Sequence, residues 1–468
     1  MTLLIQTEQL SVRTKCGVTL VEPLSLQLHG GTNLTILGET GSGKSLLAQA
    51  IMGALPHELV AEGQVLIEGD ALSCHQRRQY WGKRLAMLPQ EPSRALDPTM
   101  TVFNQLWESL YFVGAQNKVG ARQKTQQKLT ALGLEKFSRY YPHQLSGGMA
   151  QRASFAIASA GGAYMVIADE PTKGLDDANK NIVIGLLQQI AQQGGALLTI
   201  THDIEVAEQL GGQVMVMKKG HLLEQGAAAQ VLRAPQSDYA RQLIASAPHN
   251  WAKQKKVQLM TAPLLHVQDL ALKRAKRELF EGLTFTLQRG EVLGLVGNSG
   301  IGKSSLGDAL CGLLAPEFGR IDWQTKVPRH KVLKLYQEPP SAFAPHIPLQ
   351  VLLDDVIDKH RLDRSRIPHL LRHLKLEPQL LTRSAEQVSG GELQRVAILR
   401  ALLFEPVLLF ADEVTSRLDP ITQKETLDLL IEQCARLQCT LVIVSHDKHL
   451  IEHYCHQIID LKQFVKEI

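Results

Sequence analysis

The segment GETGSGKS (residues 38–45) combines three glycines, a lysine and a serine in front of an apolar helical pattern. Glycines at this spacing let the backbone turn tightly so that successive N–H groups point at a phosphate, and the following helix presents its positive end. A second segment, GNSGIGKS (residues 297–304), matches the first position for position. Two matches in register predict two phosphate-binding loops, whereas a single match would leave room for a glycine-rich turn.

Four further motifs follow each loop in the same order. They are Gln90, LSGGMAQR (145–152), MVIADEP (165–171) and His202 after the first loop, and Gln337, VSGGELQR (388–395), LLFADEV (408–414) and His446 after the second. An ordered double set predicts two nucleotide-handling domains in one chain. We assign residues 1–247 to the first domain, 248–263 to a short linker and 264–468 to a second, shorter domain.

Composition is ordinary for a globular chain of two such domains. The 468 residues are 44% hydrophobic and 21% charged. The 50 basic and 46 acidic residues are too balanced to argue for nucleic acid as a partner. No stretch reaches the roughly 18 apolar residues of a membrane span, the first residues do not resemble a leader, and the six cysteines form no CxxC pair. These features predict a cytosolic chain with free thiols.

Short uninterrupted apolar runs alternate with helical patterns in both halves. Runs at 34–37, 165–168 and 197–200 have counterparts at 293–296, 407–411 and 441–444. Strands of this kind suit a parallel sheet covered on both faces, so the fold class is α/β.

Acidic pairs follow one of these strands in each half. Asp169 and Asp412 are placed to hold Mg²⁺, and Glu170 and Glu413 to orient or deprotonate a water molecule. An acidic pair after a strand is otherwise a helix N-cap, but the spacing to the other motifs favours catalysis. The equivalent positions of His202 and His446, each at the end of a strand, favour a contact between these histidines and the γ-phosphate. Gln90 and Gln337 would link the Mg²⁺ site to the helical region.

The SGG-x-x-QR segments resemble the signature of ATP-binding cassette (ABC) ATPases, and the resemblance covers nearly the whole chain. It implies tandem P-loop NTPase domains, each with a mainly parallel sheet core, a small antiparallel β subdomain and a helical subdomain. It implies ATP and Mg²⁺ as cofactors and hydrolysis of ATP coupled to transport. The implied ligand residues are Gly38, Glu39, Thr40, Gly41, Ser42, Gly43, Lys44, Ser45, Gln90, Ser146, Gly147, Gly148 and Asp169, with Gly297, Asn298, Ser299, Gly300, Ile301, Gly302, Lys303, Ser304, Gln337, Ser389, Gly390, Gly391 and Asp412. Those implied at the Mg²⁺ site are Ser45, Gln90, Asp169, Ser304, Gln337 and Asp412.

Cassettes of this family pair head to tail. By resemblance, Lys44 and Glu170 would share one ATP with Ser389 and Gly391. Lys303 and Glu413 would share another with Ser146 and Gly148. Each signature opens a helix whose positive N-terminus would then point at the γ-phosphate.

A narrower resemblance lies in EPSRALDP (91–98), in APQSDYARQLIASAP (234–248) and, more loosely, in EPPSAFAP (338–345), which are similar to segments of peptide and nickel importers. It implies two permease subunits and a substrate-binding protein as partners. It also implies a peripheral position on the cytoplasmic face of the inner membrane. The cargo would be a peptide, nickel or a metal held by a small chelator.

Three departures from the family pattern matter. No aromatic residue precedes Gln79 in the first half, where the family stacks adenine on a ring. Phe280 and Phe285 fit core positions of strands better than a base platform, so Arg13, Arg274 or nearby lysines are the candidates to cover the base. The cysteine cluster of some peptide importers is missing between residues 234 and 251.

Two questions stay open at the level of sequence. His449, His453 and His456 would share one face of a helix and could bind a metal, although a solvated polar face explains them as well. A ribosome-acting protein with two cassettes is the competing function, but such proteins have a long charged linker. A sugar-importer ATPase would predict one degenerate site, and DNA-repair members carry zinc modules that these cysteines cannot build.

Overall fold

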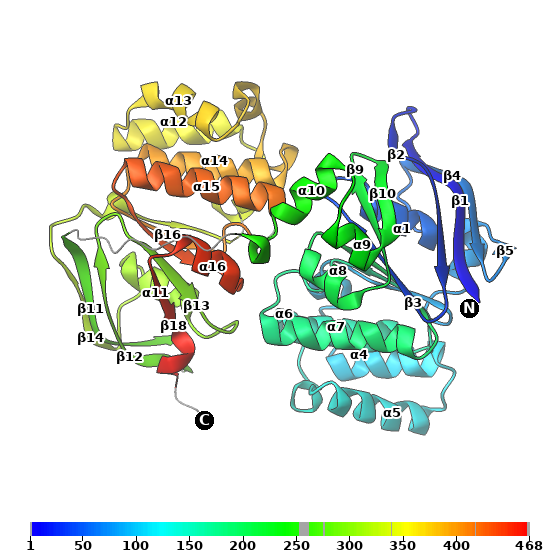
Figure 1. Ribbon diagram of the computed structural model, residues 1–468. Coiled ribbons are helices and arrows are strands. Elements are labelled where there is room, and N and C mark those ends of the chain that lie inside the picture. Colours follow the sequence, from blue (N-terminus) through cyan, green and yellow to red (C-terminus); the bar gives the residue numbers. More distant parts are fainter. Residues whose placement is uncertain (1, 252–261, 275–276, 338, 417, 466–468) are drawn as a thin grey trace. The chain divides into compact units, whose positions relative to one another are not determined.

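The computed structural model describes residues 2–251, 262–274, 277–337, 339–416 and 418–465 (Figure 1). Contacts divide the chain into two compact units, Met1–Ala247 and Pro248–Ile468. Each unit has its own sheets and its own hydrophobic core. Of the predicted linker, residues 252–261 lie outside the described part of the chain.

The main sheet of the first unit contains the apolar runs that the sequence marks as strands. In sheet order its strands are β10 (His221–Ala227), β9 (Gln213–Lys218), β3 (Thr32–Leu37), β8 (Ala196–Thr201), β7 (Met165–Asp169) and β6 (Leu85–Leu88). All neighbours pair in parallel except β10, which is antiparallel to β9. β7 and β8 are buried along their whole length. The predicted parallel sheet is therefore confirmed.

A small antiparallel sheet packs beside the first phosphate loop. Its strands, in order, are β2 (Thr19–His29), β1 (Leu3–Thr14), β4 (Leu59–Ile67) and β5 (Asp70–Ala71). Apolar side chains of this sheet share one core with α1 (Lys44–Met52) and with one face of the main sheet. The remaining helices of the sheet layers are α2 (Cys74–Arg78), α7 (Asp177–Gln192), α8 (Ile204–Leu210), α9 (Ala228–Arg233) and α10 (Asp238–Ala245).

The chain between β6 and β7 forms the helical subdomain. It contains α3 (Pro92–Ala95), α4 (Val102–Glu108) with a π-helical turn at Ser109–Val113, α5 (Lys118–Ala131) and α6 (Gly147–Ala158). These helices enclose a separate core that includes Leu106, Leu129 and Ala153. Figure 1 shows α4 and α5 at the end of the unit away from the small sheet.

The second unit repeats this plan. Its main sheet has the order β15 (Val332–Leu335), β16 (Leu408–Asp412), β17 (Thr440–Val444), β13 (Val292–Val296) and β18 (Gln457–Asp460), all parallel. Its small sheet has the order β12 (Arg277–Gln288), β11 (Pro263–Arg274) and β14 (Phe318–Trp323). Its helices are α11 (Lys303–Leu310), α12 (Leu349–His360), α13 (Ile367–His373), α14 (Gly390–Leu403), α15 (Pro420–Arg436) and α16 (Lys448–Tyr454). Within the described residues, no strand equivalent to β10 follows β18.

The cores of the two units differ at one equivalent pair of positions, where the helix after the phosphate loop packs against a strand of the main sheet. Gly307 lies in α11 against the ring of Phe410, which is fully buried in β16. A Cβ atom on Gly307 would lie 2.5 Å from a ring carbon of Phe410. The corresponding positions of the first unit, Ala48 in α1 and Ile167 in β7, pair a larger helix residue with a smaller strand residue. The volume removed from the helix is thus supplied by the strand.

This contact predicts the sign of one substitution. Gly307→Ala should destabilise the second unit by about 1–3 kcal/mol, because overpacking outweighs the roughly 0.5–1 kcal/mol that alanine normally adds to a helix. The double variant Gly307→Ala/Phe410→Ile, which copies the first unit, should recover most of the loss. Urea unfolding followed by circular dichroism measures both. A stabilised single variant would contradict the packing argument.

Candidate nucleotide-binding sites

Each phosphate loop joins a central strand to the helix that follows it, β3 to α1 and β13 to α11. Gly43 and Gly302 stand at the N-caps of these helices with φ of 95° and 115°, a region that favours glycine. A Cβ on Gly43 would approach Val21 to 2.8 Å, and one on Gly302 would approach Phe280 to 3.1 Å. Both the turn and the packing against the small sheet therefore require glycine at these positions.

The loop lysines lie folded over their own loops. The Lys44 ammonium donates to the carbonyls of Gly38 and Glu39, both at 2.7 Å, and to the Ser42 hydroxyl at 3.1 Å. Lys303 donates to the equivalent carbonyls of Gly297 and Asn298, at 2.7 and 3.1 Å. A triphosphate in either loop would offer anionic oxygens in exchange for these neutral carbonyls, and a charged acceptor makes the stronger hydrogen bond.

Asp169 ends strand β7 next to the first loop. One of its carboxylate oxygens, Oδ1, is buried with no hydrogen-bond partner among the described residues. Burial raises the pKa of Asp169, and the Ser45 hydrogen bond opposes this effect. A buried carboxylate oxygen in this situation, beside a hydroxyl, is the hard donor set that Mg²⁺ prefers. The residues present therefore fit the predicted ion.

Glu170 and Glu413 adopt the same unusual backbone conformation, with φ of 49° in both units. The Glu170 N–H donates to the Ile200 carbonyl of β8 at 2.8 Å, and the Glu413 N–H donates to Val444 of β17 at 3.2 Å. Non-glycine residues held in this region cluster at functional sites and typically cost about 1–3 kcal/mol. No helix begins directly after either acid, so the N-cap interpretation of the acidic pairs is excluded here.

A histidine holds each of these glutamates. His202 Nδ1 lies 2.8 Å from Glu170 Oε1, and His446 Nε2 lies 2.8 Å from Glu413 Oε1. Burial would raise the pKa of both carboxyl groups, but the charge and hydrogen bond of the histidine outweigh it, with help from the loop lysine. The pKa of each glutamate therefore lies below its ordinary value. The pair is a carboxylate fixed in direction, which suits a group that orients water.

The second site has contacts that the first does not show. Gln337 Nε2 donates to Glu413 Oε2 at 2.8 Å, whereas Gln90 lies exposed just after β6. The buried ammonium of Lys334, on β15, lies 3.1 Å from Asp412 Oδ2 and 2.9 Å from Asp308 Oδ1. Burial lowers the pKa of Lys334, but the hydrogen bond from Lys334 to Asp308 and the charge of Asp412 outweigh it. The sequence analysis missed Lys334 because it falls between motifs; its one signal is a lysine inside the apolar run VLKL.

The signature serines open helices α6 and α14. Ser146 Oγ accepts from the Met149 N–H, and Ser389 Oγ accepts from the Glu392 N–H. The Glu392 carboxylate in turn accepts from the N–H and the hydroxyl of Ser389, at 2.8 and 2.7 Å. Gly147 and Gly148, with Gly390 and Gly391, form the first turns of the two helices. These contacts fix the helix ends within each unit.

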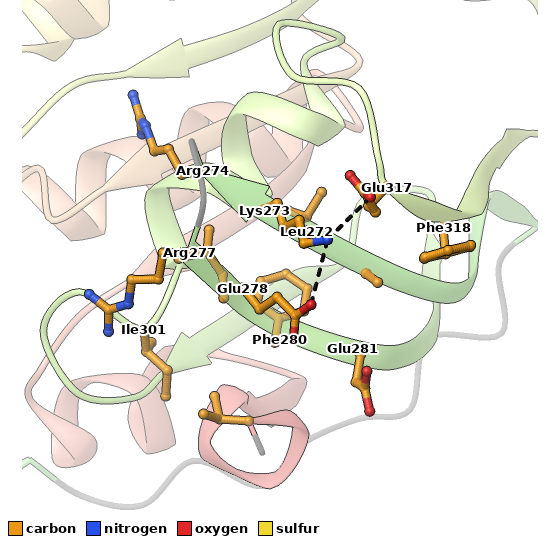
Figure 2. Close-up of a pocket in the computed structure, with 13 residues that line it drawn as sticks. Leu272, Lys273, Arg274, Arg277, Glu278, Phe280, Glu281, Ile301, Glu317 and Phe318 are labelled. Atoms are coloured by element: carbon orange, nitrogen blue, oxygen red, sulfur yellow. Dashed lines mark hydrogen bonds and ion pairs between the residues drawn. The ribbon is translucent and has the colours of Figure 1, made fainter. Parts of the chain in front are cut away.

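A pocket of about 780 Å³ adjoins the second phosphate loop (Figure 2). Figure 2 shows Arg274, Arg277 and Ile301 at one end of it. Arg274 lies 3.7 Å from Asp308 of α11, and Phe280 forms part of the wall although its ring belongs to the core. In the first unit, Arg13 pairs with Glu62 at 3.3 Å. Arginine side chains can stack on a base, and Arg274, the residue predicted to do so, lines this pocket.

The prediction that three histidines near the C-terminus share one helical face is wrong for one of them, His456. Helix α16 ends at Tyr454, so His456 does not share a helical face with His449 and His453. His456 Nδ1 accepts from the Val292 N–H at 2.9 Å, a structural role at the edge of β13. No group of three possible metal ligands occurs in the described residues.

The chain belongs to the ABC transporter family, whose sequence pattern matches residues 21–173 and 280–416. The structure in which these matches fall is a pair of α/β units with parallel and antiparallel sheets, so the predicted fold class is confirmed. The protein is an ABC transporter ATP-binding protein with two cassettes in one chain. It is an ATPase whose hydrolysis of ATP is coupled to transport.

Three relatives match this chain along nearly all of its length. The chain is 31% identical to the uncharacterized ABC transporter ATP-binding protein YejF of Escherichia coli K12, over 95% of this chain and 90% of that protein. It is 31% identical to the peptidoglycan transport ATP-binding protein YejF of Agrobacterium fabrum, over 94% and 87%. It is 30% identical to the glutathione import ATP-binding protein GsiA of Pectobacterium atrosepticum, over 94% and 81%.

Solved structures share the fold at lower identity. A structure titled RNase-L Inhibitor matches 96% of this chain and 87% of its own, with a TM-score of 0.69 and 22% identity. Identity at this level shows the fold alone. Among the described helices, none combines the length and the hydropathy that crossing a bilayer would need.

The glutamate geometry predicts the effect of removing one charge. Glu170→Gln and Glu413→Gln keep the side-chain volume but remove the carboxylate that each histidine holds, and a general base typically supplies about 10²–10⁴-fold. Each variant should lower steady-state ATP turnover of the assembled transporter more than tenfold, while binding of ATP persists. A variant that retained most of its turnover would show that its site does not take part in the cycle.

Arg274 and Arg277, at one end of the pocket beside the second phosphate loop, predict weak discrimination between bases. In a Lys44→Ala background, which leaves only the second site to bind, GTP should compete with ATP within about tenfold. Arg274→Ala/Arg277→Ala should weaken both nucleotides by about tenfold, since base stacking contributes roughly 1–3 kcal/mol. Displacement of a fluorescent nucleotide measures the affinities for ATP and GTP in the background chain and in the double arginine variant.

Lys273→Ala is the matched control. Figure 2 shows that this lysine bridges Glu278 and Glu317, at 3.5 and 3.3 Å, on the same pocket wall. It should leave nucleotide affinity unchanged. If Lys273→Ala weakened nucleotide binding as much as the arginine variant does, the base contact would be assigned to the lysine. A preference for ATP over GTP above a hundredfold would show that another contact distinguishes the bases.

Proposed function

We propose that this chain drives uptake of peptide-containing cargo through two partner permeases, with a separate binding protein supplying the cargo. The observation that carries the proposal is the doubled Glu–His geometry, because two complete hydrolytic centres in one chain supply both ATP sites of a transporter. Peptidoglycan and glutathione, which appear in the names of two relatives, both contain peptide bonds. Nickel or a metal–chelator complex is the second cargo class, and it rests on the segment resemblance alone.

Within this proposal the two units pair head to tail. Lys44 and Glu170 share one ATP with Ser389 and Gly391, and Lys303 and Glu413 share the other with Ser146 and Gly148. The first turns of α6 and α14 support this arrangement, because a helix N-terminus presents N–H groups and a positive dipole end to an anion. Both helices exceed ten residues, so the dipole is fully developed.

Each site residue then has a distinct role. The loop N–H groups and the loop lysine bind the β- and γ-phosphates. Magnesium, when bound, neutralises phosphate charge, and Ser45 with Asp169, or Ser304 with Asp412, would hold it along with Gln90 or Gln337. Glu170 and Glu413 orient the attacking water and accept its proton, and His202 and His446 keep these carboxylates in position beside the γ-phosphate.

The segment after Gln90 is our candidate for permease docking. Gln105 holds it in shape, since its side chain donates to the carbonyls of Asp97 and Met100 and accepts from the Asp97 N–H, all at 3.0 Å. Ser93 and Ala95 are exposed, whereas Leu96 is buried in the core of the helical subdomain. The docking face therefore excludes Leu96, and a substitution there would test stability instead of docking.

The equivalent segment of the second unit has a different shape. Pro339–Ala342 forms a 3₁₀ turn, and the Arg400 guanidinium donates to the Ala342 carbonyl at 2.8 Å and lies 4.4 Å from the centre of the Phe343 ring. Residue 338 of this predicted segment lies outside the described residues. Two unlike segments suit two unlike permeases. Docking to these membrane proteins would place the chain on the cytoplasmic face of the membrane as a peripheral subunit.

Substitution of the exposed docking positions tests this surface. Ser93→Trp/Ala95→Trp should reduce cargo uptake at least tenfold and leave ATP binding unchanged, because the added rings cover the face offered to the permease. The matched control is Lys124→Trp, at an exposed position of α5 in the same subdomain. Uptake of a labelled tripeptide and cross-linking to the permeases are the measurements. Normal uptake by the double variant would reject this docking surface.

Co-purification separates the proposal from a role on ribosomes. The chain should purify from detergent extracts with two membrane subunits, and reconstitution of that complex with its binding protein should give ATP-dependent accumulation of peptide cargo. Sedimentation with ribosomes in place of membrane subunits would contradict the import proposal and favour the ribosomal alternative. Accumulation of nickel or a chelated metal without peptide uptake would reassign the cargo.

A further inference from the structure

A lysine in the second unit occupies the place that a methionine takes in the first. Lys334 pairs with Phe410 across β15 and β16, as Met87 pairs with Ile167 across β6 and β7. The Lys334 side chain is only 5% exposed. Its ammonium donates to the Ser304 carbonyl in the first turn of α11 and to Asp308, both at 2.9 Å, and lies 3.1 Å from Asp412 Oδ2.

The neighbouring helix position differs in the same way. Asp308 lies as far beyond Lys303 as Gln49 lies beyond Lys44. Gln49 Oε1 is buried with no hydrogen-bond partner among the described residues, whereas Asp308 is paired with Lys334. The added acid and the added lysine cancel in formal charge. This exchange therefore changes what contacts the aspartate at the end of the strand without changing the net charge of the exchanged pair.

That contact bears on magnesium. In the first site, Asp169 Oδ1 is buried and has no hydrogen-bond partner among the described residues. In the second, Asp412 Oδ2 is already engaged by an ammonium that two other oxygens hold in place. A magnesium ion or a water molecule bound to it would need an oxygen of the same carboxylate, and the Lys334 ammonium already occupies one side of that carboxylate with a like charge.

We propose that Lys334 competes with Mg²⁺ for Asp412, so that the second site binds ATP with a weaker dependence on Mg²⁺ than the first. The two sites of the transporter are then unequal: the first requires the metal for tight binding, and the second holds nucleotide partly through the Lys334 cluster. This inference rests on the proposed role of Asp412 at the Mg²⁺ site.

A purely structural ion pair would have a different consequence. Buried ion pairs often contribute little to stability and serve to fix local geometry. If Lys334 only filled space between α11 and the sheet, exchanging the cluster for the first-unit pair would leave the Mg²⁺ dependence of binding unchanged. The metal response therefore separates the two interpretations.

The experiment uses the full chain and measures binding, not turnover. Affinity for a fluorescent ATP analogue is titrated with Mg²⁺ and with EDTA, in a Lys44→Ala background to report the second site and in a Lys303→Ala background to report the first. The gain in affinity on adding Mg²⁺ should be about tenfold larger at the first site, which is within the usual 10–100-fold effect of partners that contact a metal ligand.

Exchange of the cluster provides the matched test. Asp308→Gln/Lys334→Met copies the first unit without changing net charge and should raise the Mg²⁺ gain of the second site about tenfold. Gln49→Asp/Met87→Lys in the first unit should lower its gain by a similar factor. Retained binding of the analogue at saturating Mg²⁺ shows that each variant is folded. Equal Mg²⁺ gains in parent and exchanged chains, or a loss of Mg²⁺ affinity when Lys334 is removed, would overturn the proposal.

The same data show whether the underlying assignment has failed instead. If residues 297–304 are not a nucleotide site, Lys44→Ala will abolish all binding and no second site will be detected. If the site exists and Asp412 does not face magnesium, Asp412→Asn will leave the Mg²⁺ gain unchanged. The Lys334 inference alone fails when Asp412→Asn removes the gain and the exchange of the cluster does not alter it.

Discussion

Parallel pairing of three central strands is the constraint on which each unit depends. β3 pairs with β8 and β8 with β7 in the first unit, and β13 pairs with β17 and β17 with β16 in the second. Because parallel strands end at the same edge, the phosphate loop, the acidic pair and the histidine meet there although they are far apart in the sequence. The Glu170–His202 and Glu413–His446 contacts follow directly from this pairing.

Backbone geometry is shared by the two units more closely than side-chain chemistry. The left-handed glycines of the loops and the left-handed glutamates recur with nearly the same φ values. The differences gather under the second loop, where Gly307, Asp308, Lys334 and Phe410 replace Ala48, Gln49, Met87 and Ile167. Phe410 lies against Gly307 and Lys334, and Lys334 pairs with Asp308, so the four replacements form one connected cluster beside Asp412.

The small antiparallel sheets do more than cover the core. In the first unit a Cβ on Gly43 would lie 2.8 Å from Val21 of β2, and in the second a Cβ on Gly302 would lie 3.1 Å from Phe280 of β12, so each small sheet leaves little room for a side chain at the loop. The sheet that supports the loop in the second unit also supplies Arg274 and Arg277 to the adjoining pocket. Support of the phosphate loop and one wall of the adjoining pocket thus come from one hairpin.

The sequence by itself determined the two loops, the order of the motifs, the parallel strands and the family, because each of these depends on local spacing or on hydrophobic pattern. It also identified the residues that form the Glu–His pairs, although not which ring nitrogen makes each contact. Tertiary structure alone decided the rest. Lys334 reads as an interruption of an apolar strand until pairing with β16 and packing under α11 place its ammonium beside Asp412 and Asp308. His456 fits a helical repeat until α16 ends at Tyr454, and the burial of Leu96 follows only from the packing of the helical subdomain. In each case the deciding contact joins residues from separate elements, and no periodicity within one element encodes it.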